Sequence, residues 1–295
     1  HVVGSGQDDL IITDTEVINR ISGGSGNDVF QGGSEDFLDY SLEDAYPEEH
    51  KNGSGINANL STGKITDTYG DIDQINNLGN EEHIKNIIGT QNDDIFYDSN
   101  EDNIILGGYG QDKILSSGGN DTLKGGLGDD IIEIGEGDDI IYGDDEITSG
   151  GKDQFIFKGD FGFDTIEDFE INNDKIIIEL NDQDQDVVLE GIETNSLKIK
   201  KIGQNSQENT ITLNSAAGII TASTLALATT EVMGLTTFTD VTSNQNIDGN
   251  DDILDFSKIT DSLVIDLDSK SFQQLSSGLQ FNFDGYENII GGSDI

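Results

Sequence analysis

Aspartate is the residue type in this sequence whose number and spacing could do chemistry. The chain carries 59 Asp and Glu residues against 14 Lys and Arg, for a formal net charge of -45, and it has three His and no Cys. Carboxylate and carbonyl oxygens are the ligands that calcium and magnesium prefer, whereas zinc and copper favour Cys or His. The excess negative charge disfavours nucleic acid as a partner, because phosphates would be repelled. The composition therefore indicates a cation as the natural partner.

The aspartates recur with a period close to nine. Six of them in residues 88–142 are separated by 9, 10, 9, 9 and 9 residues, and an insertion around Leu106 accounts for the longer step. They are Asp93, Asp102, Asp112, Asp121, Asp130 and Asp139. A branched apolar residue stands two places after each Asp, and glycines crowd the four places before it. Six turn residues followed by three strand residues are too short a unit for a helix, so the pattern predicts a solenoid of short parallel strands.

The unit is clearest at residues 125–133, which read Gly-Gly-Leu-Gly-Asp-Asp-Ile-Ile-Glu. It resembles the nonapeptide of the RTX family, Gly-Gly-x-Gly-x-Asp-x-hydrophobic-x, a calcium-binding repeat. The resemblance implies an all-β fold, a parallel right-handed β-roll in which two nonapeptides form one coil. It also implies that several Ca²⁺ ions are bound between turns that lie one coil apart.

The resemblance further implies the ligands. Each ion would take a carboxylate from two turns, as in the pair Asp93 and Asp112, together with backbone oxygens of the turn residues before each Asp. The predicted metal ligands are Asp8, Asp28, Asp93, Asp102, Asp112, Asp121, Asp130, Asp139, Asp153, Gly89, Gln91, Gly107, Gly108, Tyr109, Gly110, Ser116, Ser117, Gly118, Gly119, Gly125, Gly126, Leu127 and Gly128. Because the carboxylates would repel one another without an ion, we expect folding to depend on calcium.

The repeat pattern divides the chain into five predicted regions. We expect a short β-roll at 1–40, a β-rich insertion at 41–87, the central roll at 88–158, a cap with a further β-rich module at 159–245, and the start of a second unit at 246–295. Residues 56–60 read as a strand of the insertion, and 197–200 and 210–213 as antiparallel strands.

Two further patterns concern the ends of the roll. Phe155, Phe157, Phe161, Phe163 and Phe169 are predicted to seal its open end against solvent. Residues 251–257 echo 36–41, and Asn-Ile-Ile-Gly occurs at both 86–89 and 288–291. Because residues 1–4 look like a third copy of that motif, we expect the chain to be a fragment of a larger secreted bacterial protein.

No catalytic site is predicted. Carboxylate doublets such as Asp129-Asp130 could suggest a glycosidase-like pair, but neighbours on a strand point to opposite faces, and metal ligation explains them better. The glycine-rich turns lack the Lys of a phosphate loop, and no Gly-x-Ser-x-Gly elbow occurs. His50 and His83 lack a second His four residues on, and both are predicted to be surface residues.

The leading functional hypothesis is a calcium-dependent folding region of a secreted or cell-surface RTX protein, serving as a structural scaffold or adhesin spacer. The resemblance implies export from a bacterium by a type I secretion route. Two alternatives stay open: a non-catalytic carbohydrate-binding or cap region of a secreted protease, lipase or epimerase, and the target-binding part of an RTX toxin. An extracellular glycan or protein is thus a candidate partner, and no apolar run is long enough to span a membrane.

Overall fold

The computed structural model describes residues 1–14, 16–45, 54–76, 82–144, 151–170 and 173–180, and beyond them the strand segments 186–190, 196–202, 208–214, 227–231, 246–248, 253–255, 263–266, 271–274, 280–284 and 288–290. Nearly all regular structure in these ranges is β-strand, with the 3-10 helix η1 (Tyr40–Ala45) as the exception. None of the helical structure described is long and apolar enough to cross a membrane. The predicted all-β class is confirmed.

Two long sheets form the body of the protein, and successive strands of the roll alternate between them. The first sheet runs in the order β1 (Val2–Val3), β3 (Arg20–Ser22), β5 (Phe37–Asp39), β9 (Asn86–Ile88), β11 (Ile104–Tyr109), β13 (Thr122–Leu127), β15 (Ile140–Tyr142), β17 (Phe163–Ile166), β21 (Glu208–Asn214), β20 (Ser196–Ile202) and β19 (Asp186–Glu190). The second runs β2 (Leu10–Ile12), β4 (Val29–Gln31), β8 (Ile72–Ile75), β7 (Lys64–Thr66), β6 (Asn57–Asn59), β10 (Ile95–Tyr97), β12 (Lys113–Leu115), β14 (Ile131–Ile134), β16 (Gln154–Phe157), β18 (Lys175–Leu180) and β22 (Leu227–Glu231).

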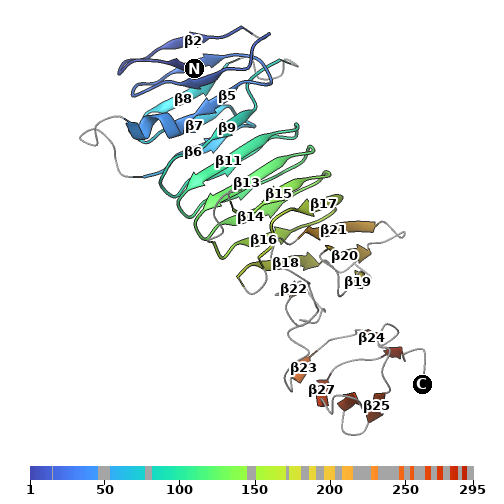
Figure 1. The fold of residues 1–295 in the computed structure, drawn as a ribbon. Coiled ribbons are helices and arrows are strands. Elements are labelled where there is room, and N and C mark those ends of the chain that lie inside the picture. The colour runs from blue at the N-terminus through green and yellow to red at the C-terminus, as the bar shows by residue number, and fades with distance from the viewer. Residues whose placement is uncertain are drawn as a thin grey trace.

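The coils of the roll stack in parallel register, as Figure 1 shows from β9 to β16. Ile105 lies beside Leu123, and Ile114 lies beside Ile132, so that one coil takes 18 residues, or two nonapeptides. Leu106 pairs with Ile88 on one side and with Lys124 on the other, again 18 residues away in each direction. The predicted parallel β-roll is therefore confirmed, but the predicted insertion around Leu106 is wrong.

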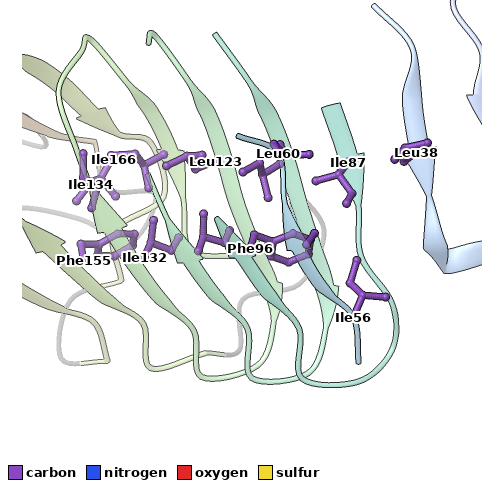
Figure 2. Close-up of a cluster of buried hydrophobic side chains, with 14 of the residues drawn as sticks. Leu38, Ile56, Leu60, Ile87, Phe96, Leu123, Ile132, Ile134, Phe155 and Ile166 are labelled. Carbon is purple, nitrogen blue, oxygen red and sulfur yellow. The ribbon is translucent and has the colours of Figure 1, made fainter. Parts of the chain in front are cut away.

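The core lies between the two sheets. Each short strand points its middle residue inward, because side chains alternate between the faces of a strand. Figure 2 shows Phe96, Ile132 and Phe155 of the second sheet in a row, opposite Leu123 and Ile166 of the first. All five side chains are fully buried. A single apolar row per sheet is thus enough to hold the coils together.

The segment between β5 and β9 adds three strands without interrupting either sheet. In the first sheet, β5 pairs directly with β9. In the second, an antiparallel meander of β8, β7 and β6 fills the space between β4 and β10, with its outer strands parallel to the roll. The predicted strand at 56–60 is confirmed as β6. The meander widens the second sheet by two strands at this coil.

Beyond β17, the first sheet continues into antiparallel strands. Leu197 of β20 pairs with Leu213 of β21, as expected, and β21 lies parallel to β17. Phe157 and Phe161 stack edge to face with ring centroids 5.0 Å apart, and both are fully buried, as are Phe155 and Phe169. Phe163 does not join them. Its side chain is 59% exposed, because the inward positions of β17 belong to Asp164 and Ile166.

The strands near the C-terminus repeat the topology of the insertion. β24 (Ile253–Asp255) pairs in parallel with β28 (Asn288–Ile290) in the register of β5 with β9. The antiparallel set β25 (Leu263–Asp266), β26 (Ser271–Gln274) and β27 (Gln280–Asp284) matches the meander, and β27 pairs with β23 (Asn246–Asp248) as β8 pairs with β4. The sequence echo therefore corresponds to a repeated strand arrangement.

Neighbouring isoleucines on β15 provide a test of the core. Ile141 is fully buried, whereas Ile140 is 43% exposed. Ile141→Ala should lower the free energy of unfolding by about 2–5 kcal/mol through the cavity it leaves, and Ile140→Ala by at most about 1 kcal/mol. Urea denaturation in saturating calcium measures both. Equal losses would show that the assignment of inward and outward positions is wrong.

Candidate functional site

The candidate site is a row of carboxyl groups at the turns, on each edge of the roll. One Asp or Asn stands two residues before each inward core residue and is itself buried. We call these residues the inner row; its members in the central and C-terminal coils are Asp94, Asn103, Asp112, Asp121, Asp130, Asp139, Asp153, Asp164 and Asp174. Their side chains point into the turn because they share the inward face of the strand with the core residue.

Hydrogen bonds link the inner row from coil to coil. The backbone N–H of Asp94 donates to Oδ1 of Asp112, the N–H of Asp112 donates to Oδ1 of Asp130, and both distances are close to 2.8 Å. The other edge has the same ladder, in which the N–H of Asp121 donates to Oδ1 of Asp139. The ladder satisfies one oxygen of each carboxylate and holds the turns in register.

The second oxygen of many inner-row carboxylates has no hydrogen-bond partner. This is the case for Oδ2 of Asp28, Asp112, Asp130, Asp139, Asp153 and Asp164. A buried carboxylate oxygen without a partner is costly, and buried charges are normally paired or bound to metal. The turns therefore contain an acceptor that a cation would satisfy.

Glycine brings a backbone carbonyl up to this oxygen. A Cβ at Gly107 would lie 2.4 Å from Oδ2 of Asp112 and 2.3 Å from the carbonyl oxygen of Gly125 in the next coil. A Cβ at Gly125 would meet Oδ2 of Asp130 and the carbonyl oxygen of Gly143 in the same way. Only glycine leaves room for both acceptor oxygens around this point, and two acceptors on the same side of a turn repel one another unless a cation lies between them.

Burial raises the pKa of the inner-row carboxyl groups, and neighbouring carboxylates raise it further, although the ladder hydrogen bonds partly offset both effects. The pKa rises to about 9 for Asp112 and Asp164, to about 7 for Asp139 and to about 6 for Asp130. Without a counter-ion, folding therefore favours the protonated acids over the charged carboxylates. A cation can take the place of the proton at neutral pH.

The sequence of these turns matches a known family of repeats. Residues 13–39, 88–123 and 115–147 match the model of the RTX calcium-binding nonapeptide repeat, in four copies. These segments are RTX repeats. No curated protein sequence is similar enough to this chain to count as a match.

Two solved structures are among those similar to this chain. The R3 subunit of the AlgE6 mannuronan C5-epimerase from Azotobacter vinelandii is 24% identical, over 50% of this chain and 89% of the subunit, with a TM-score of 0.17. The extracellular lipase LipA from Serratia marcescens is 18% identical, over 72% of this chain and 37% of the lipase, with a TM-score of 0.22.

At three turns, the buried inner-row residue stands one position after the aspartate that the sequence predicted as the ligand. The predicted ligands Asp8, Asp93 and Asp102 are exposed, and the inner-row positions beside them belong to Asp9, Asp94 and Asn103. Asp93 instead accepts a hydrogen bond at 2.7 Å from the backbone N–H of Gln111. The predicted pairing of Asp93 with Asp112 is replaced by that of Asp94 with Asp112, because the coils are offset by 18 residues.

Residues such as Asp93 form a second series, the outer row, which consists of the residue before each inner-row position. Asp8, Asp93, Asp102, Asp129 and Asp138 accept hydrogen bonds from the backbone of the following coil. The inner ladder runs in the opposite direction, since there each backbone N–H donates to the side chain of the following coil. The acidic doublets therefore tie each turn to both of its neighbours.

The other predicted ligands lie in the turns, and their roles stay predictions. Carbonyl oxygens of Gly107, Gly108, Gly110, Gly125, Ser116 and Ser117 closely approach glycines of the neighbouring coil. The carbonyl of Leu127 already accepts the N–H of Gly110, and Gly118 forms a bridge with Glu136. Gln91 and Tyr109 are exposed, and Gly119, Gly126 and Gly128 have positive φ angles. Among the residues described, no three acidic or His side chains group as metal ligands, so an ion would also need backbone oxygens.

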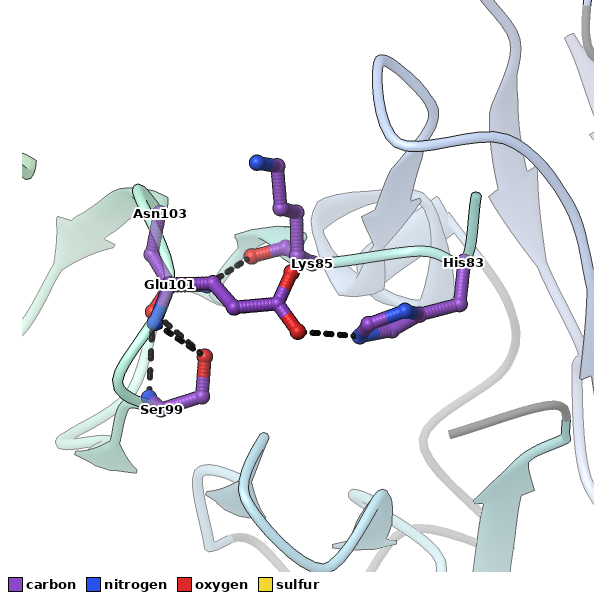
Figure 3. A network of polar contacts seen from close by, with 5 residues as sticks. All are labelled: His83, Lys85, Ser99, Glu101 and Asn103. Carbon is purple, nitrogen blue, oxygen red and sulfur yellow. Dashed lines mark hydrogen bonds and ion pairs between the residues drawn. The ribbon is translucent and has the colours of Figure 1, made fainter. Parts of the chain in front are cut away.

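Sequence reasoning missed several buried polar residues. Asp73 of the insertion takes an inner-row position, accepting the N–H of Asp28 at Oδ1 and the hydroxyl of Tyr40 at Oδ2. Nearby, Glu43 is buried against Thr68, and burial raises its pKa to about 8. His83 is 4% exposed rather than a surface residue, and its Nε2 lies 3.6 Å from Glu101 (Figure 3). His50 lies outside the described residues.

The raised pKa values predict how the metal-free chain responds to pH. A carboxyl group whose folded pKa is above its unfolded value of 3.8 stabilises the fold at low pH, and this contribution is lost as the pH rises through the folded pKa. Circular dichroism at 25 °C in metal-free buffer should therefore show more β-structure at pH 5 than at pH 9.

Saturating calcium provides the control for this measurement, because the ion then replaces the proton and the difference in β-structure between the two pH values should shrink. Equal or greater metal-free β-structure at pH 9 would contradict the buried acidic ladder.

Proposed function

We propose that this chain is a calcium-dependent folding region of a secreted or cell-surface bacterial protein, exported by a type I route, and that it acts as a scaffold or spacer with no catalytic site of its own. The observation that carries the proposal is the series of buried, partnerless carboxylate oxygens that face backbone carbonyls along both edges of the roll. The calcium-binding repeat family of these turns supports it.

The donor set fits calcium. The second oxygen of Asp112 and the carbonyl of Gly125 are both hard oxygen donors, and the same pairing recurs at Asp130 with Gly143. Calcium takes 6–8 oxygen ligands in flexible geometry, whereas magnesium requires a tight octahedron and retains several waters. A series of nearly identical backbone turns, with one carboxylate each, therefore favours calcium. When bound, the ion would supply the positive charge that these buried oxygens lack.

Calcium binding would also decide whether the chain folds. Of its 295 residues, 59 are acidic, so the unfolded chain is favoured by repulsion, and it has no preformed site. Each occupied site stabilises the fold by about 2.7 kcal/mol when free calcium is 100 times its Kd. Several such sites outweigh the burial of the acids. The chain would thus remain unfolded in a compartment poor in calcium and fold after export.

A calcium titration followed by circular dichroism tests this function. Exhaustively chelated protein at neutral pH should show little β-structure, and added calcium should produce a cooperative transition to a β spectrum. Magnesium at the same concentrations serves as the control and should not. An unchanged β spectrum in chelator would show that the roll stands without ions.

An adjacent pair of aspartates separates a ligand from a merely acidic turn residue. Asp130 is buried and has a partnerless oxygen, whereas Asp129 is exposed and accepts one backbone N–H. Asp130→Asn should raise the calcium concentration at the midpoint of folding roughly tenfold, equivalent to about 1.4 kcal/mol. Asp129→Asn removes the same charge one residue away and should change the midpoint by less than about twofold. Equal shifts would mean that net charge alone controls folding.

A further inference from the structure

The inner-row turns are of two kinds, which differ in the residue four places before the inner-row side chain. We call this residue the second position of the turn. It is glycine before five inner-row aspartates, and four of these have a partnerless Oδ2; the four pairs are Gly24 with Asp28, Gly108 with Asp112, Gly126 with Asp130, and Gly135 with Asp139. The fifth is Asp36, after Gly32, whose Oδ2 accepts the N–H of Gly33 and the hydroxyl of Thr13.

Other turns carry a residue with a side chain at the second position. In four of these turns the backbone N–H of that residue donates to the inner-row side chain of its own turn. The pairs are Ser5 with Asp9 (2.6 Å), Thr90 with Asp94 (2.6 Å), Ser99 with Asn103 (3.0 Å) and Glu170 with Asp174 (2.6 Å). Figure 3 shows this closure at Asn103, where the Ser99 hydroxyl also donates. In these four turns the protein itself satisfies the oxygen that a turn such as that of Gly126 and Asp130 leaves bare. The N–H of Ser117, before Asp121, donates instead to Asp98, and Oδ2 of Asp164, after Asp160, stays bare.

Backbone conformation explains the difference. Gly24, Gly108 and Gly126 have φ angles of +92°, +111° and +113°, a region that residues with a side chain rarely adopt. In this conformation the N–H of Gly126 points along the sheet and donates to the carbonyl of Gly143 at 2.8 Å. It is therefore not available to Asp130. Thr90, by contrast, turns its N–H toward the carboxylate of its own turn, Asp94.

We propose that the backbone amide at the second position decides whether a turn takes a calcium ion. An amide that donates to the inner-row side chain of its own turn closes that turn, and an amide turned away, as at the positive-φ glycines Gly24, Gly108 and Gly126, leaves it open. This inference rests on the proposed function. It assigns Asp28, Asp112, Asp130 and Asp139 to open turns, and Asp9, Asp94 and Asp174 to closed ones.

The electrostatics of a closed turn oppose a cation. At Asp94, the backbone N–H of Thr90 donates to Oδ2 with an N···O distance of 2.6 Å, and the Thr90 hydroxyl donates to Oδ1 at 3.0 Å. A cation approaching Oδ2 would be repelled by that N–H and would gain less from an oxygen that is already satisfied. The neighbouring carbonyl of Gly107 is nevertheless in the usual place, since a Cβ at Gly89 would lie 2.2 Å from it and 2.3 Å from Oδ2 of Asp94. The turn at Asp94 thus has the oxygens of a site and lacks only the open amide.

Thr90→Gly tests the inference by creating a site. Calcium stoichiometry, measured by isothermal titration calorimetry and by native mass spectrometry on the full chain, should rise by one ion relative to the wild type. Thr90→Ala is the matched control. It removes the same hydroxyl but keeps a residue that favours negative φ, so its stoichiometry should stay that of the wild type. Circular dichroism in saturating calcium verifies that both variants fold.

Three results would overturn the inference. A folded Thr90→Gly chain that binds the same number of ions as a calcium-binding wild type would refute it while leaving the proposed function intact. Gain of an ion by Thr90→Ala as well would show that the hydroxyl, not the amide direction, closes the turn. A wild-type chain that binds no calcium would refute the proposed function and this inference together.

Discussion

The structure depends on one constraint, the burial of like-charged carboxyl groups in stacked turns. The inner-row ladder is what fixes each turn over the next, as in the bond from the N–H of Asp112 to Asp130. Each ladder bond uses one oxygen of a carboxylate, and the second oxygen is left beside a carbonyl next to a glycine. The apolar core is thin, with one inward residue for each short strand, and so contributes little to offset this repulsion. The roll is consequently a fold whose stability is linked to whatever neutralises its edges.

The architecture could be predicted from the sequence because two classes of residue repeat with the same period of nine. The glycines and aspartates predicted the turns, and the apolar residues predicted the strands. Where the two classes indicated different positions for a turn, the apolar residues gave the correct one. Phe96, Ile105 and Ile114 are spaced by nine and all lie in the core. Acidic doublets such as Asp93-Asp94 offer two candidates for the inner row, and choosing the outer one created the false insertion at Leu106. The core residue decides the choice, since the inner-row residue always stands two places before it.

The insertion could be predicted only as β-structure. Its side-chain contacts could not be predicted, because they do not recur at a regular spacing in the sequence. Tyr40 lies 33 residues from its partner Asp73 in sequence, and His83 lies 18 residues from Glu101. The meander keeps the ladder running through an irregular stretch: the N–H of Asp28 donates to Asp73, and the N–H of Ile56 donates to Asp94. The same pairing of roll strands with a meander recurs in the C-terminal strands. Side-chain detail of this kind follows from the fold and not from the repeat.

The distribution of open and closed turns gives the roll a direction. Within the insertion and just after it, protein groups satisfy the inner row: Tyr40 donates to Asp73, Thr90 to Asp94 and Ser99 to Asn103. Before the insertion, Asp28 keeps a bare oxygen. From Asp112 to Asp164 most inner-row carboxylates keep a bare oxygen. In a solenoid each coil contacts only its neighbours, so that a coil which is stable by itself can template the next. The coils just after the insertion therefore bear a smaller electrostatic penalty without calcium than the coils that follow, where a bare oxygen recurs at most turns. Ion-driven folding would then extend from the insertion toward the C-terminal cap, with the closed turns as its fixed starting edge.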